Sequence, residues 1–251
     1  MVDTLELPGA RALFSTRQGG VSEGPYRSLN LGLLTDDAPE RVAENRRRLA
    51  AEAHVEPERV AMGWQVHGAE LREWDAPDPE RAYSEVRSKA RPRSALAARG
   101  GKELSRVDGH LTGQADLGLL VLVADCYPVA LSDGDQAAML HCGWRPLAGG
   151  IVERAVGRFA RPPAAAVGPG IGGCCYEVGP EVLEHFADVP GAADGRMLDL
   201  RRVIEARLEA AGVTEIGHLD CCTSCHPDLY FSHRRDDALT GRQAGLCVLN
   251  R

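Results

Sequence analysis

Long apolar runs are missing from this chain, and that absence narrows the class of protein it can be. No stretch of its 251 residues approaches the roughly 20 apolar residues that a membrane-spanning helix needs. The first residues, MVDTLELPGARALF, have neither the basic start nor the apolar centre of a secretory signal peptide. We therefore expect a cytoplasmic protein that makes no membrane contact.

Lysine is also scarce: the chain contains Lys89 and Lys102, and its other basic residues are nearly all arginine. The formal net charge of −7 argues against a nucleic-acid-binding protein, which normally presents a broad basic surface. The exception is the segment 81–106, where eight arginines and lysines stand against Glu85 and Glu103. Because this segment has no hydrophobic period, we predict a mobile basic loop at about 81–106.

A P-loop signature, GxxxxGK[ST], is absent, so the commonest nucleotide-phosphate motif is excluded. The glycine-rich stretch VGPGIGGCCYEVG can hold an anion on its backbone amides or simply form a tight turn. Eight histidines are too few for a multicopper cluster. A chain of this length can bury a stable core without disulfide bonds. We therefore expect the eight cysteines to be free thiols that bind metal, take part in chemistry or pack in the core.

Helical and strand periods alternate along the chain. Amphipathic helices are predicted over 38–53, 147–160, 180–188 and 198–212. In the first of these, Asn45 and the arginines 46–48 are expected on the solvent side. The apolar runs 117–133, broken at Asp125-Cys126, and 137–146 are typical of strands buried on both faces. The loose alternation favours one α/β domain, residues 1–251, with a mixed sheet covered by helices.

Three potential metal ligands stand near the ends of predicted strands. Cys126 follows an apolar strand in ADCYP, His141 ends the next one in MLHCGWR, and His67 lies in WQVHG. Neighbouring strands lie about 4.8 Å apart, so their ends can bring an imidazole and a thiolate together. Two imidazoles and one thiolate suit zinc and leave a fourth position for water or substrate. Spacing alone, however, favours hydrogen-bonded core histidines and a small buried thiol.

The same residues allow a metal-free interpretation. Cys126 would be a nucleophile, His141 its base and Asp125 the residue that orients the imidazole. An aspartate beside a turn is more often a turn former, so the two interpretations of Asp125 stay open.

A second group of thiols lies in CCTSCHP, which contains Cys221, Cys222, Cys225 and His226. Cysteines three residues apart are typical of zinc or redox motifs. A zinc ribbon needs another pair, and the remaining adjacent pair is Cys174-Cys175. We expect structural thiols here rather than a second metal site.

A set of longer motifs extends over almost the whole chain. They occur in the order STRQGGVSEGPYRSLNLG, NRRRL, WQVHG, ADCYPV, HCGWRPLAGG, GPGIGGCCYEVG, CHPDLYFSHRRD and TGRQAG. This pattern resembles the bacterial YfiH/YlmD family, also called the multicopper polyphenol oxidoreductase (laccase) domain family. The resemblance implies a four-layer α-β-β-α sandwich with mixed sheets, similar to the catalytic domain of cytotoxic necrotising factor.

The resemblance also implies a metal site and an activity. The family's two histidine ligands and one cysteine ligand correspond to His67, Cys126 and His141, with zinc as the metal and copper as the alternative. The implied activity is phosphorolysis of adenosine, inosine and methylthioadenosine, with adenosine deamination as a side reaction. The partners are then a purine nucleoside and phosphate, and we expect a monomer or weak homo-oligomer.

Five residues beside turns or ligands are selected for substrate binding. They are Arg17, Gln65, Asp125, Arg145 and Arg235. Guanidinium groups near turns suit phosphate, and Arg17 and Arg235 are the first choices for it. Gln65 and Asp125 are also expected to orient the metal ligands. Trp64 and Tyr127 flank the ligands and can either stack on a flat ring or belong to the core.

Three alternative functions stay open. The first is a cysteine amidase that edits UDP-muramoyl peptidoglycan precursors, with Cys126 as nucleophile and His141 as base. The second is a copper polyphenol oxidase, although no methionine lies beside the three ligands in sequence to supply a weak axial donor. The third is a non-catalytic, zinc-stabilised interaction module, whose closed site would use Cys142 or Cys225 as a fourth ligand.

The chain departs from the family pattern at two places. The basic segment at about 81–106 resembles an insertion before Asp108, where relatives have a shorter link. HCGWRP stands where relatives have HAGWRG, which introduces Cys142 beside a predicted ligand and Pro146 after Arg145. A proline restricts the turn in which it stands.

Overall fold

The computed structural model describes residues 2–76, 83, 98–99, 102–103 and 105–250. Most of the predicted basic loop at 81–106 lies outside these residues. Within that range the structure describes Tyr83, which is buried, and a short pairing of β5 (Ala98–Arg99) with β6 (Lys102–Glu103). Among the described helices, none combines the length and apolar character needed to cross a bilayer.

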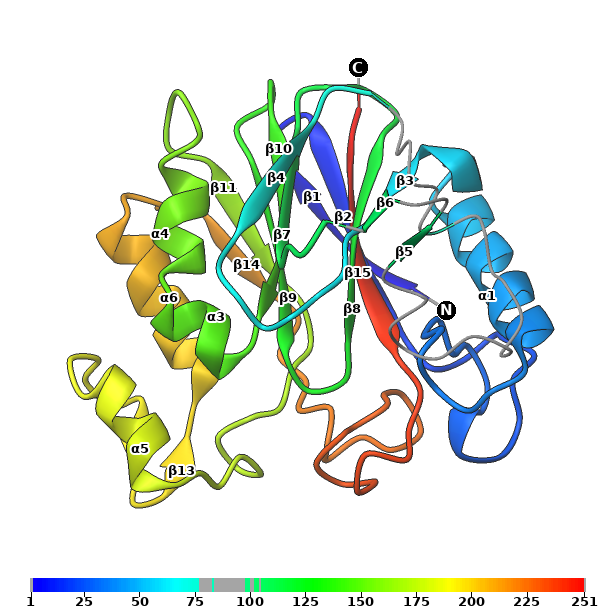
Figure 1. Ribbon diagram of the computed structural model, residues 1–251. Helices are drawn as coiled ribbons and strands as arrows, with labels where there is room; N and C mark the ends of the chain where they lie inside the picture. The colour runs from blue at the N-terminus through cyan, green and yellow to red at the C-terminus, as the bar shows by residue number, and fades with distance from the viewer. Residues whose placement is uncertain (1, 77–82, 84–97, 100–101, 104, 251) are drawn as a thin grey trace.

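Two β-sheets form the centre of the molecule (Figure 1). The five-stranded sheet has the order β1-β2-β15-β8-β3 and consists of β1 (Val2–Leu7), β2 (Ala10–Ser15), β15 (Gln243–Leu249), β8 (Gly118–Val123) and β3 (Val60–Ala61). Its strands pair antiparallel except for β3, which runs parallel to β8. The mixed sheet predicted from the sequence is confirmed in this half.

The six-stranded sheet is mixed as well. It has the order β14-β11-β9-β10-β7-β4 and consists of β14 (Ile216–His218), β11 (Ala164–Val167), β9 (Tyr127–Ser132), β10 (Ala137–Cys142), β7 (Gly109–Thr112) and β4 (Leu71–Trp74). The pairs β11/β14 and β4/β7 are parallel, and the others are antiparallel. A separate short pair joins β12 (Ala193–Asp194) to β13 (Met197–Leu198).

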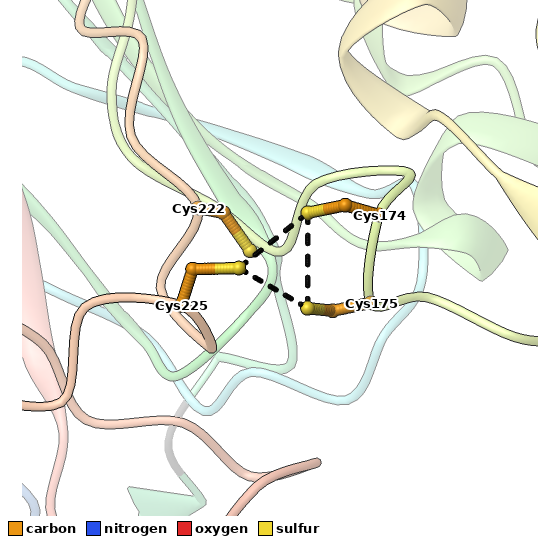
Figure 2. Close-up of side chains that lie close together, drawn as sticks. All are labelled: Cys174, Cys175, Cys222 and Cys225. Atoms are coloured by element: carbon orange, nitrogen blue, oxygen red, sulfur yellow. Dashed lines mark hydrogen bonds between the residues drawn. The ribbon is translucent and has the colours of Figure 1, made fainter.

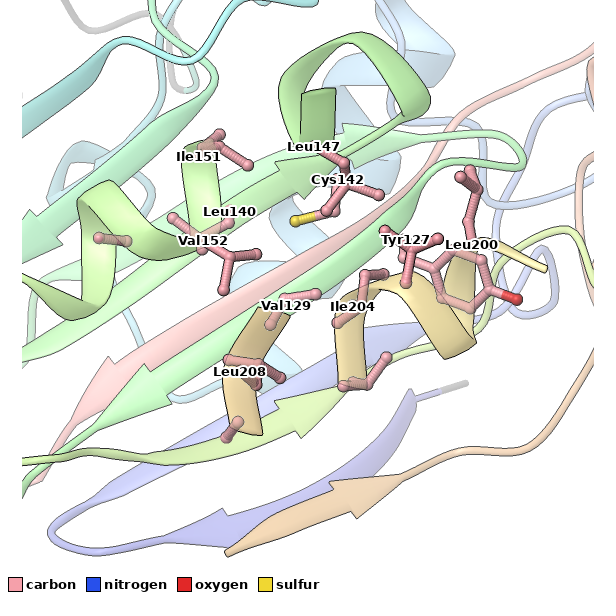
Figure 3. Packing of buried hydrophobic residues seen from close by; sticks show 14 of the residues in the cluster. Tyr127, Val129, Leu140, Cys142, Leu147, Ile151, Val152, Leu200, Ile204 and Leu208 are labelled. Carbon is pink, nitrogen blue, oxygen red and sulfur yellow. The ribbon is translucent and has the colours of Figure 1, made fainter. Parts of the chain in front are cut away.

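Period-two alternation divides the core into three apolar clusters. In β8, Leu119 and Val121 pack between the two sheets, whereas Leu120 packs with α1 (Pro39–Glu52) on the outer face of the first sheet. The outer face of the second sheet carries the largest cluster (Figure 3). The helices that cover it are α3 (Trp144–Ala148), α4 (Ile151–Val156), α5 (Pro180–Leu183) and α6 (Leu200–Ala210). The layers therefore run helix, sheet, sheet, helices.

Helices are present at every predicted place, with two differences. The predicted helix 147–160 is divided into α3 and α4 at Gly149-Gly150, where Gly150 has φ 77° and starts the second helix. Three short 3-10 helices also occur, at Gly24–Tyr26, Pro57–Arg59 and Glu184–Phe186. The last of these continues α5, so the helix predicted at 180–188 ends early as an α-helix.

The solvent side predicted for α1 is wrong at two positions. Asn45 and Arg46 are buried, with 0% and 2% of their surface exposed. Asn45 donates to the carbonyls of Ser28 and Asn30, and Arg46 donates to that of Leu31. The polar side chains face inward because the loop after β2 has no sheet partner and takes its hydrogen bonds from the helix.

Two of the segments that carry the chain from one sheet to the other contain candidate metal ligands. The apolar run 117–133 is not one strand, because β8 belongs to the first sheet and β9 to the second, and Asp125-Cys126 lies between them. The segment 62–70 likewise connects β3 of the first sheet to β4 of the second. The two crossings place Cys126 and His67 at the junction of the sheets.

Candidate metal centre and its cavity

His67, Cys126 and His141 converge as the sequence predicted. Their potential ligand atoms all lie within 4.8 Å of one another. The Cys126 Sγ is 3.9 Å from the His67 Nε2, and the rings of His67 and His141 are 4.7 Å apart between centroids. Among the residues that the structure describes, no fourth metal-binding side chain belongs to this group. The donor set is therefore two imidazoles and one thiol.

Strand pairing explains the convergence. β9 and β10 are antiparallel, with Pro128 opposite His141, so Cys126 just before β9 lies beside the end of β10. His67 reaches the same point from the segment 62–70, which connects β3 to β4. The sequence predicted that strand ends would bring Cys126 and His141 together, and the register confirms it.

Asp108 holds this arrangement together and was missed by the sequence analysis. Its side chain is fully buried just before β7. One carboxylate oxygen accepts the Nδ1–H of His141 at 2.7 Å and the backbone N–H of His67 at 3.0 Å. The other accepts the N–H groups of Val66 and Gly68, at 3.0 and 2.8 Å. A carboxylate on Nδ1 fixes the tautomer of His141 and leaves its Nε2 free for a metal ion.

The ionised forms of Cys126, His141 and Asp108 stabilise one another. Burial would raise the pKa of Cys126, but His141 and His67 outweigh it and lower that pKa to about 6. Burial would lower the pKa of His141, but Cys126 and Asp108 outweigh it and raise that pKa to about 9. Burial also opposes the ionised form of Asp108, yet its hydrogen bonds from His141 and the backbone leave its pKa below the usual value. The thiolate, which is the form that binds metals, is thus favoured.

The backbone around the centre adopts unusual conformations. His67 has φ 58° and Asp125 has φ 88°, both in the left-handed region that costs a non-glycine residue energy. Such outliers cluster at functional sites. Gly143 is also required here, because a Cβ on it would stand 2.8 Å from the Cys126 Sγ and 3.5 Å from the His67 Cδ2.

The three ligands lie in the wall of a cavity of about 690 Å³. Its lining includes the predicted substrate residues Gln65, Asp125 and Arg145. Further flat or basic side chains in the wall are Trp64, Trp144, Tyr176, His233, Arg46, Arg234 and Arg242. A cavity of this size that combines apolar, aromatic and basic groups is typical of a small-molecule site.

Gln65 and Asp125 are engaged with the protein itself. The Gln65 amide donates to the Leu122 carbonyl and accepts from the Leu122 N–H, both at 2.8 Å. The Asp125 carboxylate accepts from the Thr223 hydroxyl and from the Arg234 N–H, both at 2.7 Å. Their contacts are those of positioning residues that fix the segments next to His67 and Cys126.

The two arginines ranked first for phosphate do not line the cavity. Arg17 donates to the carbonyls of Arg27 and Pro227 and lies over the Phe231 ring, 4.5 Å from its centroid. Arg235 is paired with Asp236 and donates to the carbonyls of residues 223, 224 and 230. Arginines also satisfy the carbonyls of irregular loops, and sequence proximity to a turn cannot distinguish that use from ligand binding.

Of the two roles left open for Tyr127, ring stacking and core packing, the structure supports core packing. Tyr127 is buried, its hydroxyl donates to the Ile171 carbonyl at 3.1 Å, and a Cβ on Gly170 would touch its ring. It is a core residue, whereas Trp64 lines the cavity as expected.

The fourth ligands expected of a closed interaction module are elsewhere. Cys142 is fully buried in the apolar cluster under α3 and α4. Cys225 lies with three other cysteines in a different group. Burial and the neighbouring charge of Cys126 raise the pKa of Cys142 well above its usual value, so this thiol stays protonated in the core.

Fold and site together define a mixed α/β protein with a His-Cys-His centre open to a cavity. A sequence profile of the family described as multi-copper polyphenol oxidoreductase laccase matches residues 11–250. The chain therefore belongs to this family, which is also the YfiH/YlmD family of the resemblance, and the donor set suits its expected metal binding.

Known relatives align with this chain over nearly their full lengths. A purine nucleoside phosphorylase of Streptomyces coelicolor is 37% identical over 96% of both chains. The purine nucleoside phosphorylase YfiH of Escherichia coli is 34% identical over 96% of this chain and 94% of its own. Among solved structures, YlmD of Geobacillus stearothermophilus matches with a TM-score of 0.82 and 33% identity, covering 97% of this chain and 93% of that one.

Proposed function

We propose that the protein is a zinc-dependent purine nucleoside phosphorylase acting on adenosine, inosine and methylthioadenosine, with adenosine deamination as a side activity. One observation carries the proposal. Two imidazoles and a thiolate meet within 4.8 Å in the wall of a cavity of about 690 Å³, in a chain whose full-length relatives bear the name purine nucleoside phosphorylase.

The donor set fits a metal ion with an open position. His67, Cys126 and His141 would hold it, and Asp108 keeps the Nε2 of His141 directed to the centre. Bound there, zinc would supply a Lewis acid that stabilises negative charge developing on the substrate. Copper can use the same donors, so the metal is part of the test.

The cavity offers separate features for the two substrates. Trp64, Trp144 and Tyr176 are flat surfaces for a purine ring. Arg145, Arg234 and Arg242 replace Arg17 and Arg235 as the groups for phosphate, because they line the same cavity. The Arg145 guanidinium lies over the Trp144 ring, 4.3 Å from its centroid, which keeps its edge available to an anion.

The reaction requires these groups to align two partners. A phosphate oxygen forms a bond to the anomeric carbon of ribose while the carbon–nitrogen bond to the purine breaks. The purine leaves with that electron pair and takes up a proton, giving a free base and ribose 1-phosphate. The arginines position the phosphate and offset its charge, and the aromatic residues hold the purine, so most of the rate gain comes from orientation.

Product analysis with and without phosphate tests the proposal. The purified protein is incubated with adenosine or inosine, and the products are separated by liquid chromatography, with bound metal measured on the same sample. We expect free base and ribose 1-phosphate in equal amounts, only when phosphate is present. Inosine formed from adenosine without phosphate reports the deaminase side activity. Release of free base at the same rate with and without phosphate, or no product from any nucleoside, contradicts the proposal.

The alternative functions predict different experimental results. An amidase with Cys126 as nucleophile and His141 as base would release an amino acid from a UDP-muramoyl precursor and need no phosphate. A copper oxidase would contain copper and oxidise phenols, and it would need a weak axial donor beside the three ligands. A closed interaction module lacks support, because neither Cys142 nor Cys225 joins the three ligands.

Several expectations remain proposals alongside the activity. They are a single enzyme domain over residues 1–251, a cytoplasmic location, a monomer or weak homo-oligomer, and a likeness to the catalytic domain of cytotoxic necrotising factor. The layered core supports the last of these.

A further inference from the structure

Four cysteines outside the His-Cys-His centre gather at one point. Cys174 and Cys175 stand in the glycine-rich turn after β11, and Cys222 and Cys225 stand in the loop after β14. Figure 2 shows the four side chains pointing toward one another from the two loops. Their sulfur atoms all lie within 4.8 Å of one another. The sequence favours structural thiols at these positions, and the convergence of both cysteine pairs changes that interpretation.

The sulfur separations match a metal site. The Sγ of Cys225 is 3.6 Å from that of Cys174 and 3.3 Å from that of Cys175, and the sulfurs of Cys174 and Cys175 are 3.7 Å apart. A tetrahedral zinc ion with zinc–sulfur distances of about 2.3 Å separates its sulfurs by about 3.8 Å. A disulfide would need about 2.05 Å. We propose that Cys174, Cys175, Cys222 and Cys225, the four-cysteine cluster, form a structural site for one zinc ion.

The protein backbone arranges the cluster through contacts of its own. Gly170 and Cys222 form a parallel bridge, and the Thr223 N–H donates to the Gly170 carbonyl at 2.9 Å. The Gly172 N–H donates to the Cys222 Sγ at 3.2 Å. Backbone N–H groups directed at sulfur stabilise a thiolate ligand and fix its orientation.

Four thiolates fill a tetrahedral coordination sphere, so this site has no position for a substrate. A closed site of this kind contributes to folding rather than chemistry. Binding releases the four thiol protons as the ion takes their place on sulfur. Tetrahedral sets of four sulfur donors select zinc or iron, and the oxygen-based ions are disfavoured.

The site would fasten the loop that completes the cavity. Thr223, between two cluster cysteines, donates its hydroxyl to Asp125, which precedes Cys126. The same carboxylate accepts the N–H of Arg234, whose side chain lines the cavity. A metal ion at the cluster would thus hold one wall of the active site without touching the substrate.

Zinc analysis of matched variants tests the site. Zinc per chain is measured in protein prepared under reducing conditions without chelator, in a Cys126→Ser background that removes the other centre. We expect about one equivalent. The further double change Cys174→Ser/Cys225→Ser is expected to remove it. Cys221→Ser is the matched control, since Cys221 is in the same loop but outside the cluster. This result does not depend on whether the protein is a phosphorylase.

A second measurement uses the unaltered protein, in case the double variant does not fold. Thiols are alkylated before and after treatment with a strong chelator, and modified peptides are identified by mass spectrometry. The four cluster cysteines should react only after chelation, while Cys221 reacts equally in both samples. X-ray absorption at the zinc edge of the Cys126→Ser protein should show sulfur neighbours alone.

Three results would overturn the proposal. The first is an unchanged zinc content in the folded double variant. The second is alkylation of the four thiols without chelator, or a disulfide among them in freshly reduced protein. The third is an equivalent of iron in place of zinc, which would reject the zinc assignment.

Discussion

The two cysteine-containing sites of this protein are built in opposite ways. At the His-Cys-His centre, His67 and Cys126 lie in segments that cross between the two sheets, and His141 lies near the end of β10. The buried Asp108 accepts hydrogen bonds from His141 and from the 66–68 backbone. At the four-cysteine cluster, the donors stand on two loops, and Cys174 and Cys225 are exposed. One site has three mixed donors in the wall of the cavity, and the other has four identical donors that do not line that cavity.

This difference teaches how one chain can separate reactivity from stability. A three-donor site needs an external scaffold to keep its fourth position open, and two packed sheets supply it. A four-donor site needs no such scaffold, because the ion itself fastens the loops. Changes at the first site should therefore affect the reaction and leave the fold intact, and changes at the second should do the reverse.

The largest effect is expected from Cys126→Ser. Serine is a poor zinc ligand at neutral pH, so the three-donor centre loses its metal and phosphorolysis should fall more than about 100-fold. The melting temperature should change less than the rate, since the Cys126 side chain is only partly buried and lies at the edge of the apolar cluster between the sheets. Initial rates with inosine and phosphate, and thermal melts, measure both. Cys221→Ser is the control, and wild-type rates in the Cys126→Ser protein would reject the metal centre.

Asp108→Asn should have the next largest effect. The change keeps the size of the side chain but removes the negative charge that fixes the His141 tautomer, and such supporting groups contribute about 10- to 100-fold to metal affinity or activity. Metal affinity, measured by competition with a coloured chelator, should weaken with the rate. Affinity and rate that both stay within about two-fold of wild type would show that the 2.7 Å contact does not orient the ligand.

The ligands were predictable from sequence, whereas the support was not. Buried strands ending at Cys126 and His141 give a visible apolar pattern, and the family motifs add His67. Asp108 carries no such signal, since a lone aspartate before a strand is common and its partners lie 33 to 42 residues away. Long-range hydrogen bonds leave no periodic trace in a single sequence.

The arginines and the four-cysteine cluster show the same limit. Arg17 and Arg145 both stand beside turns, and only the fold shows that one satisfies loop carbonyls while the other lines the cavity. The two cysteine pairs are about 50 residues apart, and the bridge between Gly170 and Cys222 that unites them is a tertiary contact. Helices and mixed sheets were predictable because their signals are local periods.

Arg145→Ala tests whether the arginine that lines the cavity binds phosphate. Loss of one charge-assisted hydrogen bond, worth about 1.5–3 kcal/mol, should raise the KM for phosphate by roughly 10-fold or more. The KM for the nucleoside should change less. Arg235→Ala is the contrasting variant, because its contacts are with loop carbonyls and Asp236, so it should lower thermal stability while leaving the KM for phosphate near wild type. The reverse pattern would restore Arg235 to the phosphate site.

The smallest effect, and the most informative about coupling, is expected from Thr223→Val. The valine keeps the shape but removes the hydroxyl that donates to the buried Asp125. This is one of two hydrogen bonds, with that of the Arg234 N–H, that join the loop after β14 to the segment of Cys126. An acceptor left without one of its partners costs about 1–3 kcal/mol of unfolding free energy. Denaturant unfolding should show that loss, and kcat should fall only a few-fold, while Thr223→Ser retains both. If Thr223→Val instead abolishes activity with zinc still bound at both sites, the separation of reactivity from stability fails, because the cluster loop would then act directly on the reaction.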